Sequence, residues 1–172
     1  ENEYNDRYVI APVISYQIDE KTKVTLEYNY QRANMSDVGS YYVFSPKGFE
    51  SLPVDFTSLP RGIAGTKIND HSFYGTIQHD INDNWKITAQ ASRFIYNQEG
   101  SSAWPSSVNP DGTMIRGIGI WDAQSTMTMA QAFVNGEVQT GPVRHRILAG
   151  LDMANKDYMA DWSQSHNLDL PG

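Results

Sequence analysis

Apolar and polar residues alternate with a period of two over several long segments of the chain. The clearest is residues 23–33, in which Val24, Leu26, Tyr28 and Tyr30 alternate with mostly polar neighbours. A strand separates two such sets onto opposite faces, whereas a helix would scatter both around its circumference. The pattern therefore predicts a β-strand with one apolar and one polar face.

The same alternation recurs along the chain, in segments that fall into pairs. A short turn joins the two members of each pair, and the first of these turns is the polar segment Asp19-Glu20-Lys21-Thr22. Turns of this composition join antiparallel strands in hairpins. The sequence therefore predicts an all-β chain of antiparallel up-and-down hairpins, with about six strands. The predicted strands are 7–18, 23–33, 72–79, 85–96, 124–139 and 144–156.

Two positions interrupt the regular pattern. Pro12 lies inside the first segment and lacks an N–H donor, so it indicates an edge strand or a bulge. After Ser92 the apolar residues change phase, because Phe94 and Tyr96 fall on the face opposite to Ala91. A β-bulge after Ser92 would account for this change.

The connections between the predicted strands are unequal in length. Three are short turns, whereas the alternate connections span roughly 34–69, 98–123 and 155 onward. Structureless loops longer than about 12–15 residues are uncommon in compact soluble domains. Short turns at one end, long loops at the other and strands of about 9–11 residues or more are typical of an outer-membrane β-barrel, with periplasmic turns and extracellular loops. A soluble antiparallel sandwich or a lipocalin-like barrel is the alternative.

Six strands would leave two open edges, which lipid does not tolerate. The smallest common membrane barrels have about 8 strands. We therefore expect residues 1–172 to be part of a larger transmembrane barrel domain. The chain begins at Glu1, with no initiator Met and no apolar signal core, which indicates an internal fragment or a processed chain.

Composition narrows the possible functions. The formal net charge is −7 and the pI is near 4.9, which argues against nucleic acid as a partner. The chain has no cysteine, so disulfides, Cys-ligated zinc and a thiol nucleophile are excluded. No apolar run approaches the roughly 18 residues of a membrane helix. The mean hydropathy of −0.51 is compatible with a membrane barrel, in which the two kinds of residue alternate.

Four blocks of sequence, in order, are similar to blocks of a known family. Together they resemble TonB-dependent siderophore receptors of the bacterial outer membrane, most closely those for ferric hydroxamates of the ferrichrome type. The blocks cover about residues 7 to 152. They are Arg7-Tyr8-Val9-Ile10-Ala11-Pro12 with the following Thr-rich strand, Tyr41-Tyr42-Val43-Phe44-Ser45-Pro46-Lys47-Gly48, His79-Asp80-Ile81-Asn82-Asp83-Asn84-Trp85, and Thr140-Gly141-Pro142-Val143-Arg144-His145-Arg146-Ile147-Leu148-Ala149-Gly150-Leu151-Asp152.

The resemblance implies a function in transport rather than in catalysis. It implies a barrel wall with outer loops, whose plug domain and energy-coupling segment lie outside this chain. It further implies a ferric siderophore of hydroxamate type as ligand, the TonB complex as energy-coupling partner through the missing N-terminal region, and outer-membrane lipid around the wall. The iron arrives inside its chelator, so no resident cofactor and no protein ligand to the metal are expected.

The same resemblance selects candidate ligand contacts in the long loops. Tyr42 matches a ligand-contact tyrosine of the family, and Phe44 stands where an indole is usual. Trp104 lies in the next long loop, and Tyr41, Trp121 and Arg116 are further candidates. Rigid aromatic faces bury an apolar siderophore shell, and a few polar groups orient it. Packing within the loops is the alternative role for these side chains.

Aromatic residues near strand ends also form the interfacial girdle of membrane barrels. We expect this role, or contact with lipid, for a second set of aromatic side chains in the predicted strands. The set is Tyr8, Tyr16, Tyr28, Tyr30, Trp85 and Phe94.

Other motifs do not define a site. Asp80-x-Asn82-x-Asn84 begins like a calcium loop, but Trp85 replaces the required glycine, so a hairpin turn is expected. Gly117 and Gly119 do not complete a dinucleotide fingerprint. The four histidines lack metal-ligand spacing, and no G-x-S-x-G nucleophile motif is present, so we expect no metal site and no enzyme. The competing function is a soluble secreted β-sandwich module that binds carbohydrate through Trp and Tyr.

Overall fold

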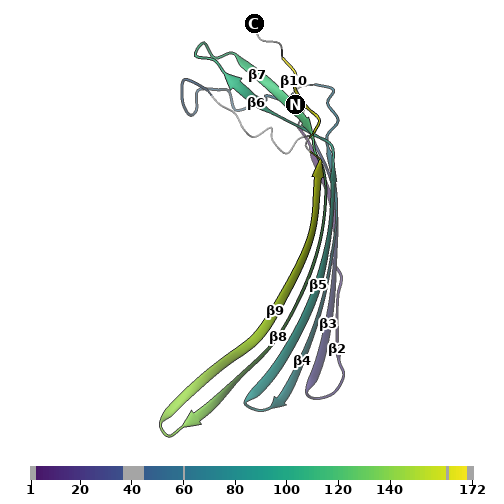
Figure 1. The fold of residues 1–172 in the computed structure, drawn as a ribbon, viewed down its shortest axis with the longest axis vertical. Helices are drawn as coiled ribbons and strands as arrows, with labels where there is room; N and C mark the ends of the chain where they lie inside the picture. The colour runs from purple at the N-terminus through teal and green to yellow at the C-terminus, as the bar shows by residue number, and fades with distance from the viewer. Residues whose placement is uncertain (1–2, 37–44, 60, 162, 170–172) are drawn as a thin grey trace.

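The computed structural model describes residues 3–36, 45–59, 61–161 and 163–169. These residues form one long, curved antiparallel sheet, which we call the wall, and a small three-stranded sheet beyond one of its ends (Figure 1). The wall contains, in spatial order, β1 (Asn5–Ile10) and β2 (Val13–Gln17) against β3 (Thr22–Met35), then β4 (Thr66–Asn82), β5 (Trp85–Glu99), β8 (Asp122–Thr140) and β9 (Val143–Asp161). The small sheet has the order β10 (Ser165–Asn167), β7 (Met114–Ile120), β6 (Ser101–Val108).

Of the edge strand or bulge predicted at Pro12, the structure shows an edge position, where Pro12 lies between β1 and β2. Both strands pair with β3, so they follow one line along the edge of the wall. Pro12 still takes part in the pairing, because its carbonyl oxygen accepts a hydrogen bond of 3.1 Å from the Tyr28 N–H. A proline is tolerated at this edge because the ladder does not need its missing donor.

The bulge predicted after Ser92 is wrong. The pairing of β5 with β4 and with β8 continues without a shift through Ser92 and Phe94, and the shift between β4 and β5 lies at Asp80 and Asn82 instead. Phe94 therefore shares the face of Ser92, where its ring meets that of Tyr74 edge-on, with centroids 5.4 Å apart. The expected role of Phe94 in the girdle or in contact with lipid is also wrong, because Phe94 lies on the face opposite to Ala91 and the other apolar residues of the alternation.

Strand pairing places apolar residues of five neighbouring strands in continuous rows across one face of the wall. One such row passes from β3 to β9 through side chains that oppose one another in register. It consists of Val24, Ile77, Ala89, Ala132 and Leu151, and the next row consists of Leu26, Gly75, Ala91, Ala130 and Met153. Leu26 is 57% exposed and Leu151 is 85% exposed, so no second layer covers these rows in the described structure.

The opposite face carries a row of polar side chains at the same height. Gln90 lies at its centre, where its side-chain amide donates to the Thr76 hydroxyl at 3.4 Å and its oxygen accepts a bond from the Gln131 amide. At the edge of the wall the hydroxyls of Ser15 and Thr25 lie 3.0 Å apart. At this height the wall is therefore a single layer with one apolar and one polar face, as the alternation predicts.

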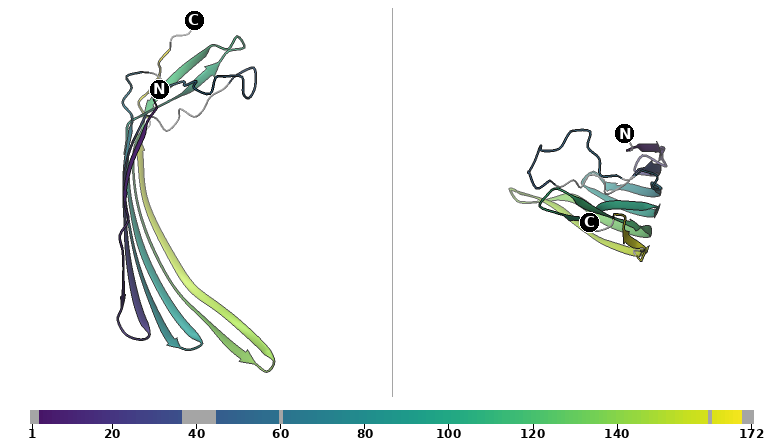
Figure 2. Two further views of the ribbon diagram at one scale, coloured as in Figure 1. Left: turned by 180° about the vertical axis from the view of Figure 1, so that it is seen from behind. Right: turned by 90° about the horizontal axis from the view of Figure 1, so that it is seen from above.

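Little of the described chain is buried. The buried apolar residues gather at the end of the wall next to the small sheet, and they are Ala33, Leu59, Ala103, Ile118 and Ala123. Seen from above, the loops extend to one side of the row of strands (Figure 2). Among the described residues no helix is long and apolar enough to cross a membrane.

The unequal connections predicted from the sequence are present. Tight turns join β2 to β3, β4 to β5 and β8 to β9 at one end of the wall, and the long connections lie at the other (Figure 1). The connection over 98–123 is not a structureless loop, since most of it forms the β6–β7 hairpin. Strands β4, β8 and β9 are longer than predicted, because the pairing continues beyond the segments in which apolar and polar residues alternate.

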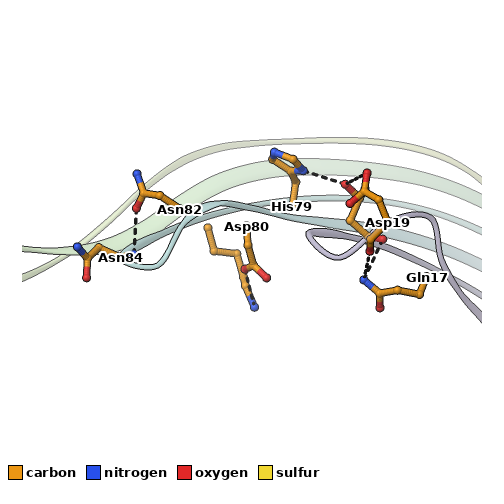
Figure 3. Close-up of polar contacts among 8 residues, drawn as sticks. Gln17, Asp19, His79, Asp80, Asn82 and Asn84 are labelled. Atoms are coloured by element: carbon orange, nitrogen blue, oxygen red, sulfur yellow. Dashed lines mark hydrogen bonds and ion pairs between the residues drawn. The ribbon is translucent and has the colours of Figure 1, made fainter.

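Side-chain hydrogen bonds hold two of the tight turns (Figure 3). Asp19 accepts the Lys21 N–H at 2.8 Å and the Thr22 hydroxyl at 3.1 Å, and these bonds keep the pKa of the Asp19 carboxyl below its ordinary value. The Thr22 hydroxyl also lies 2.9 Å from His79 Nδ1, which links this turn to the end of β4. In the next turn Asn82 accepts the Asn84 N–H at 2.9 Å, so the calcium-like motif is a hairpin turn.

Candidate ligand-binding site

The long connections gather into a structure that we call the cap, formed by β6, β7 and β10 with residues 45–59 and 61–65. The cap leans over the concave side of the wall (Figures 1 and 2). Three of the predicted ligand contacts, Tyr41, Tyr42 and Phe44, lie outside the described residues. The other three, Trp104, Trp121 and Arg116, all lie in the cap or at its base.

Trp104 lies flat across two glycines of the neighbouring strand. It pairs with Gly117, and a Cβ atom placed on Gly117 would stand 3.2 Å from the indole Nε1. A Cβ atom on Gly119 would stand 2.8 Å from the indole Cη2. The indole therefore spans both glycines, and the absence of their side chains lets it approach the sheet this closely.

The outer side of this indole remains accessible. Trp104 is 37% exposed, although strands flank it on the sheet surface. The hydroxyls of Ser106 and Ser165 lie beside it, because they are the other atoms that a Cβ on Gly117 or Gly119 would meet. We call these five residues the Trp104 platform: an open aromatic face with hydroxyl groups at its margin.

Arg116 acts as a clamp within the cap. Its Nε and Nη2 donate to the two carboxylate oxygens of Asp169, both at 2.9 Å, and its Nη1 donates to the Ser58 carbonyl at 3.3 Å. The hydrogen bonds from Arg116 lower the pKa of Asp169 to about 2. The guanidinium is thus engaged by the protein, and a ligand meets few of its donors.

Trp121 lies where β7 passes into β8, at the base of the cap. Its main-chain N–H donates to the Gly100 carbonyl at 2.8 Å, and its indole nitrogen is buried. This position makes Trp121 part of the junction between cap and wall rather than part of an open surface.

A cavity of about 380 Å³ occupies the other face of the β6–β7 hairpin. Ile118 and Ile120 line it, and they alternate along β7 with the two glycines beneath Trp104. Most of the remaining lining of the cavity, which is largely apolar, comes from Ile63, Ala64, Ser101 and His166. The two faces of the small sheet therefore differ: one presents the indole and the other encloses an apolar space.

The described residues offer binding surfaces rather than reactive groups. They contain no group of three or more His, Cys, Asp or Glu side chains that could hold a metal ion. Two histidines of the wall have neighbours in the sheet, since His71 Nδ1 lies 2.8 Å from the Tyr28 hydroxyl and His79 bonds with Thr22. The arrangement can bind and orient a ligand through aromatic, hydroxyl and apolar contacts.

Sequence reasoning missed two features of this site. It treated Gly117 and Gly119 only as an incomplete nucleotide motif, although a Gly-x-Gly within a strand also indicates a close approach by a large side chain. It also missed Asp169, because nothing in the sequence pairs this residue with Arg116 across 53 positions.

Comparisons with known proteins point to receptors. No protein-family profile matches the chain. The chain is 25% identical over 148 residues to the metal-pseudopaline receptor CntO of Pseudomonas aeruginosa strain UCBPP-PA14, an alignment covering 85% of this chain and 21% of the relative. The receptor of the same name from strain PAO1 gives the same identity and coverage. The chain thus spans about a fifth of the length of the curated relatives it matches.

The fold matches a solved receptor structure over almost the whole chain. The siderophore receptor PiuA from Acinetobacter baumannii superposes with a TM-score of 0.74 at 19% identity, covering 92% of this chain and 24% of that one. The matched proteins are receptors by name and not enzymes, in agreement with the expectation from the sequence. They support the resemblance to siderophore receptors without favouring the ferrichrome type. The chain therefore has the all-β, antiparallel fold of part of a siderophore-receptor barrel.

Proposed function

We propose that this chain is a segment of the barrel wall and outer loops of a TonB-dependent receptor in the bacterial outer membrane. In this proposal the receptor takes up a metal–siderophore complex, and the specific complex is a ferric siderophore of hydroxamate type. The observation that carries this proposal is the single-layer wall, whose exposed apolar rows lie back to back with a polar row.

The apolar rows need a covering that follows the whole face of the sheet. Leu26, Leu151 and Met153 are all more than half exposed, and they lie on the outermost strands of the rows. Hydrocarbon covers such a face continuously, and each Å² of apolar surface removed from water contributes about 25 cal/mol of stabilising free energy. Membrane strands need only about 9–11 residues, so β4, β8 and β9 are long enough to cross and to continue beyond the lipid.

The open edges of the wall support a larger barrel. Strand β9 is exposed along nearly its entire length, and β1 with β2 forms the other edge. Unpaired strand edges are not stable in lipid, so further strands of the same protein would close the cylinder. The polar face would then line the interior of the barrel, where the plug domain implied by the resemblance would lie. The TonB complex would engage the N-terminal region of the receptor, as the resemblance also implies.

The cap would form the ligand-binding mouth of this receptor. It unites the long connections at one end of the wall, over the concave side on which the interior would lie (Figure 2). Trp104 offers an accessible aromatic surface there, and Tyr41, Tyr42 and Phe44 stay proposed contacts on the strength of the resemblance. The metal is cargo held by its chelator, so the protein needs no resident cofactor.

The competing function, a secreted carbohydrate-binding sandwich, lacks support from the fold. A sandwich seals the apolar face of each sheet beneath a second sheet. In the described part of the chain, the apolar rows of the wall lie open and the small sheet continues beyond the end of the wall.

Uptake in cells tests the proposal. Deleting the gene that encodes this chain should abolish uptake of iron-55 supplied as ferrichrome, and the full-length gene on a plasmid should restore it only in cells with an intact TonB system. Unchanged ferrichrome uptake in the deletion strain contradicts the hydroxamate assignment. Recovery of the full-length protein outside the outer-membrane fraction contradicts the receptor itself.

A further inference from the structure

We infer that the end of the β8–β9 hairpin is a docking site for an acidic segment of the plug domain, which it binds through two arginines. This inference rests on the proposed function, because that function places a plug domain inside the barrel. It adds which part of the wall the plug contacts and which charge the contacting segment carries. The docking residues are Arg144 and Arg146, and Glu137 is their positioning residue.

The β8–β9 hairpin reaches further than the other two tight turns. Strand β5 begins at Trp85, which pairs with Gly136, so the last four residues of β8 pair only with β9. The end of this hairpin extends past the other turns and bends toward the concave side of the wall (Figure 1). Under the proposed function, the polar face of this end is turned toward the periplasmic opening of the barrel.

The strand register places both arginines on the polar face of the wall. Arg146 pairs with Glu137, which shares the face of Gln131 because the two lie six positions apart on one strand. Arg144 pairs with Gln139, on the same face. The two cations are therefore neighbours on the side of the wall that carries the polar row.

Glu137 holds the two guanidinium groups beside each other. Nε of Arg146 donates to one carboxylate oxygen at 3.1 Å, and Nε and Nη2 of Arg144 contact the other oxygen. The arginine side chains are 66% and 78% exposed, and within the described part of the chain the Nη groups of Arg146 have no hydrogen-bond partner. One positive charge thus stays unbalanced, and the oriented guanidinium groups present N–H donors that match the two oxygens of a second carboxylate.

A groove of about 630 Å³ separates this hairpin end from the β4–β5 turn. The charged residues on the turn side of the groove are Asp80, Asp83 and Lys86, and Lys86 forms an ion pair of 3.3 Å with Asp80. The surplus charge is therefore negative on the turn side and positive on the hairpin side. A carboxylate that enters the groove is attracted to the arginines and repelled by the turn.

Apolar side chains beside the arginines indicate that the occupant is a protein segment. Leu148 follows the arginines on β9, pairs with Asn135 and is 71% exposed. Phe133 lies diagonally across from it on the same face, where it pairs with Gly150. A phosphate ion or a lipid head group would satisfy only the charges. A polypeptide segment with an acidic and an apolar side chain would satisfy the charges and also remove Leu148 from water.

The test is photo-crosslinking within the full-length protein in isolated outer membranes. The photoreactive residue benzoylphenylalanine replaces Gln139, which lies on the polar face opposite Arg144, and in the matched control it replaces Val138 on the other face. Mass spectrometry identifies the crosslinked peptide. Heat-modifiable migration on gels reports whether each variant has formed its barrel, so that loss of folding is not read as loss of docking.

We expect the probe at Gln139 to crosslink to a plug peptide that contains Asp or Glu, and the probe at Val138 to give no crosslink to the plug. Arg146→Glu should lower the yield from Gln139 by about fivefold or more, because two negative charges then face each other. His145→Glu, on the opposite face, should leave this yield within about twofold of the wild type. Replacing the crosslinked acidic residue with Lys should restore the yield in the Arg146→Glu protein.

A crosslink from Gln139 to a plug peptide without acidic residues overturns the charge class. The docking site is overturned if Gln139 crosslinks only to lipid or to another protein, or not at all, or if folded Arg146→Glu protein keeps the full yield. In these cases TonB-dependent uptake of ferrichrome stays intact. Failure of the receptor function has a different signature, since a strain that lacks the gene then takes up ferrichrome as well as its parent.

Discussion

Arg116 and Asp169 lie 53 positions apart in the chain and form a two-point ion pair, with both of its hydrogen bonds 2.9 Å long. The main-chain N–H of Arg116 adds a third bond of 2.8 Å to the same carboxylate. A further bond, from Nη1 to the Ser58 carbonyl, reaches residues 45–59. One side chain thereby joins three segments of the cap that are distant in sequence.

Arg116→Ala should loosen the cap and leave the wall intact. The side-chain bonds to Asp169 are charge-assisted and partly shielded from water, so their loss should cost about 1–2 kcal/mol of local stability. Limited digestion of the full-length protein with chymotrypsin, followed by mass spectrometry, should show faster cleavage within the cap. The control is Lys67→Ala, whose ion pair with Glu99 is well exposed and should contribute nothing measurable. Equal cleavage rates in both variants would refute the clamp.

The same pair should make cap stability depend on pH in the acid range. The folded-state pKa of Asp169 is about 2 and the unfolded value is 3.8, so the contribution is complete above about pH 4 and is lost as the pH falls toward 2. Pepsin digestion at several pH values across this window should show increasing cleavage of the cap as the pH falls. Asp169→Asn should be cleaved readily throughout the window. If the wild type and the variant respond alike, other carboxyl groups control this transition.

Two neighbouring positions on β8 should respond in opposite ways to the same substitution. Ala132→Arg would place a charge in an apolar row, and under the proposed placement in a membrane this costs about 2–4 kcal/mol near the centre of the bilayer. Gln131→Arg would place it on the polar face, where water or protein can solvate it. Urea unfolding of the full-length protein in lipid vesicles should separate the two variants by this amount. Similar stabilities would contradict the assignment of the faces.

Gly136→Ala should destabilise the β5–β8 pairing. Its new Cβ would collide with the ring of Trp85 and stand 2.7 Å from the main-chain oxygen of Asn84, so the backbone must move, at about 1–3 kcal/mol. Gly75→Ala is the matched control, because its Cβ would meet only the Leu26 side chain, at an ordinary 3.6 Å. The unfolding midpoint should fall for Gly136→Ala and stay unchanged for Gly75→Ala. Equal midpoints would show that the Trp85 ring moves aside without cost.

The wall was predictable because its two-residue alternation is a local property with a direct structural meaning. Val24, Leu26 and the residues opposite them fall on one face as predicted, and three hairpin turns lie where turn-forming residues interrupt the pattern. The error after Ser92 has a physical cause. On β5 the apolar residues of the rows end near Ala91, and beyond it aromatic side chains such as Phe94 lie on the opposite face. The alternation in the sequence therefore changes phase although the strand pairing does not shift.

The cap was less predictable because its contacts join segments with no shared periodicity. Its hairpin places Trp104 opposite Gly117, a pairing that depends on a register shift between Pro105 and Ser107. The clamp between Arg116 and Asp169 likewise depends on where β10 meets β7, which no local pattern specifies. The resemblance selected Trp104 as a candidate contact, whereas the glycines on which its indole packs required the fold.

The alternation of the wall also determines where such a protein can change over evolutionary time. Adding one residue to a tight turn, such as that held by Asp19, would carry Val24 and Thr25 of the following strand β3 to each other's side of the sheet, together with every later residue of that strand. The same addition at Asp111 or Gly112, in the exposed turn of the β6–β7 hairpin, leaves both faces of the wall as they are. Insertions and deletions should therefore accumulate in the long connections of the cap, while the strands of the wall keep a constant length from one descendant of this protein to the next.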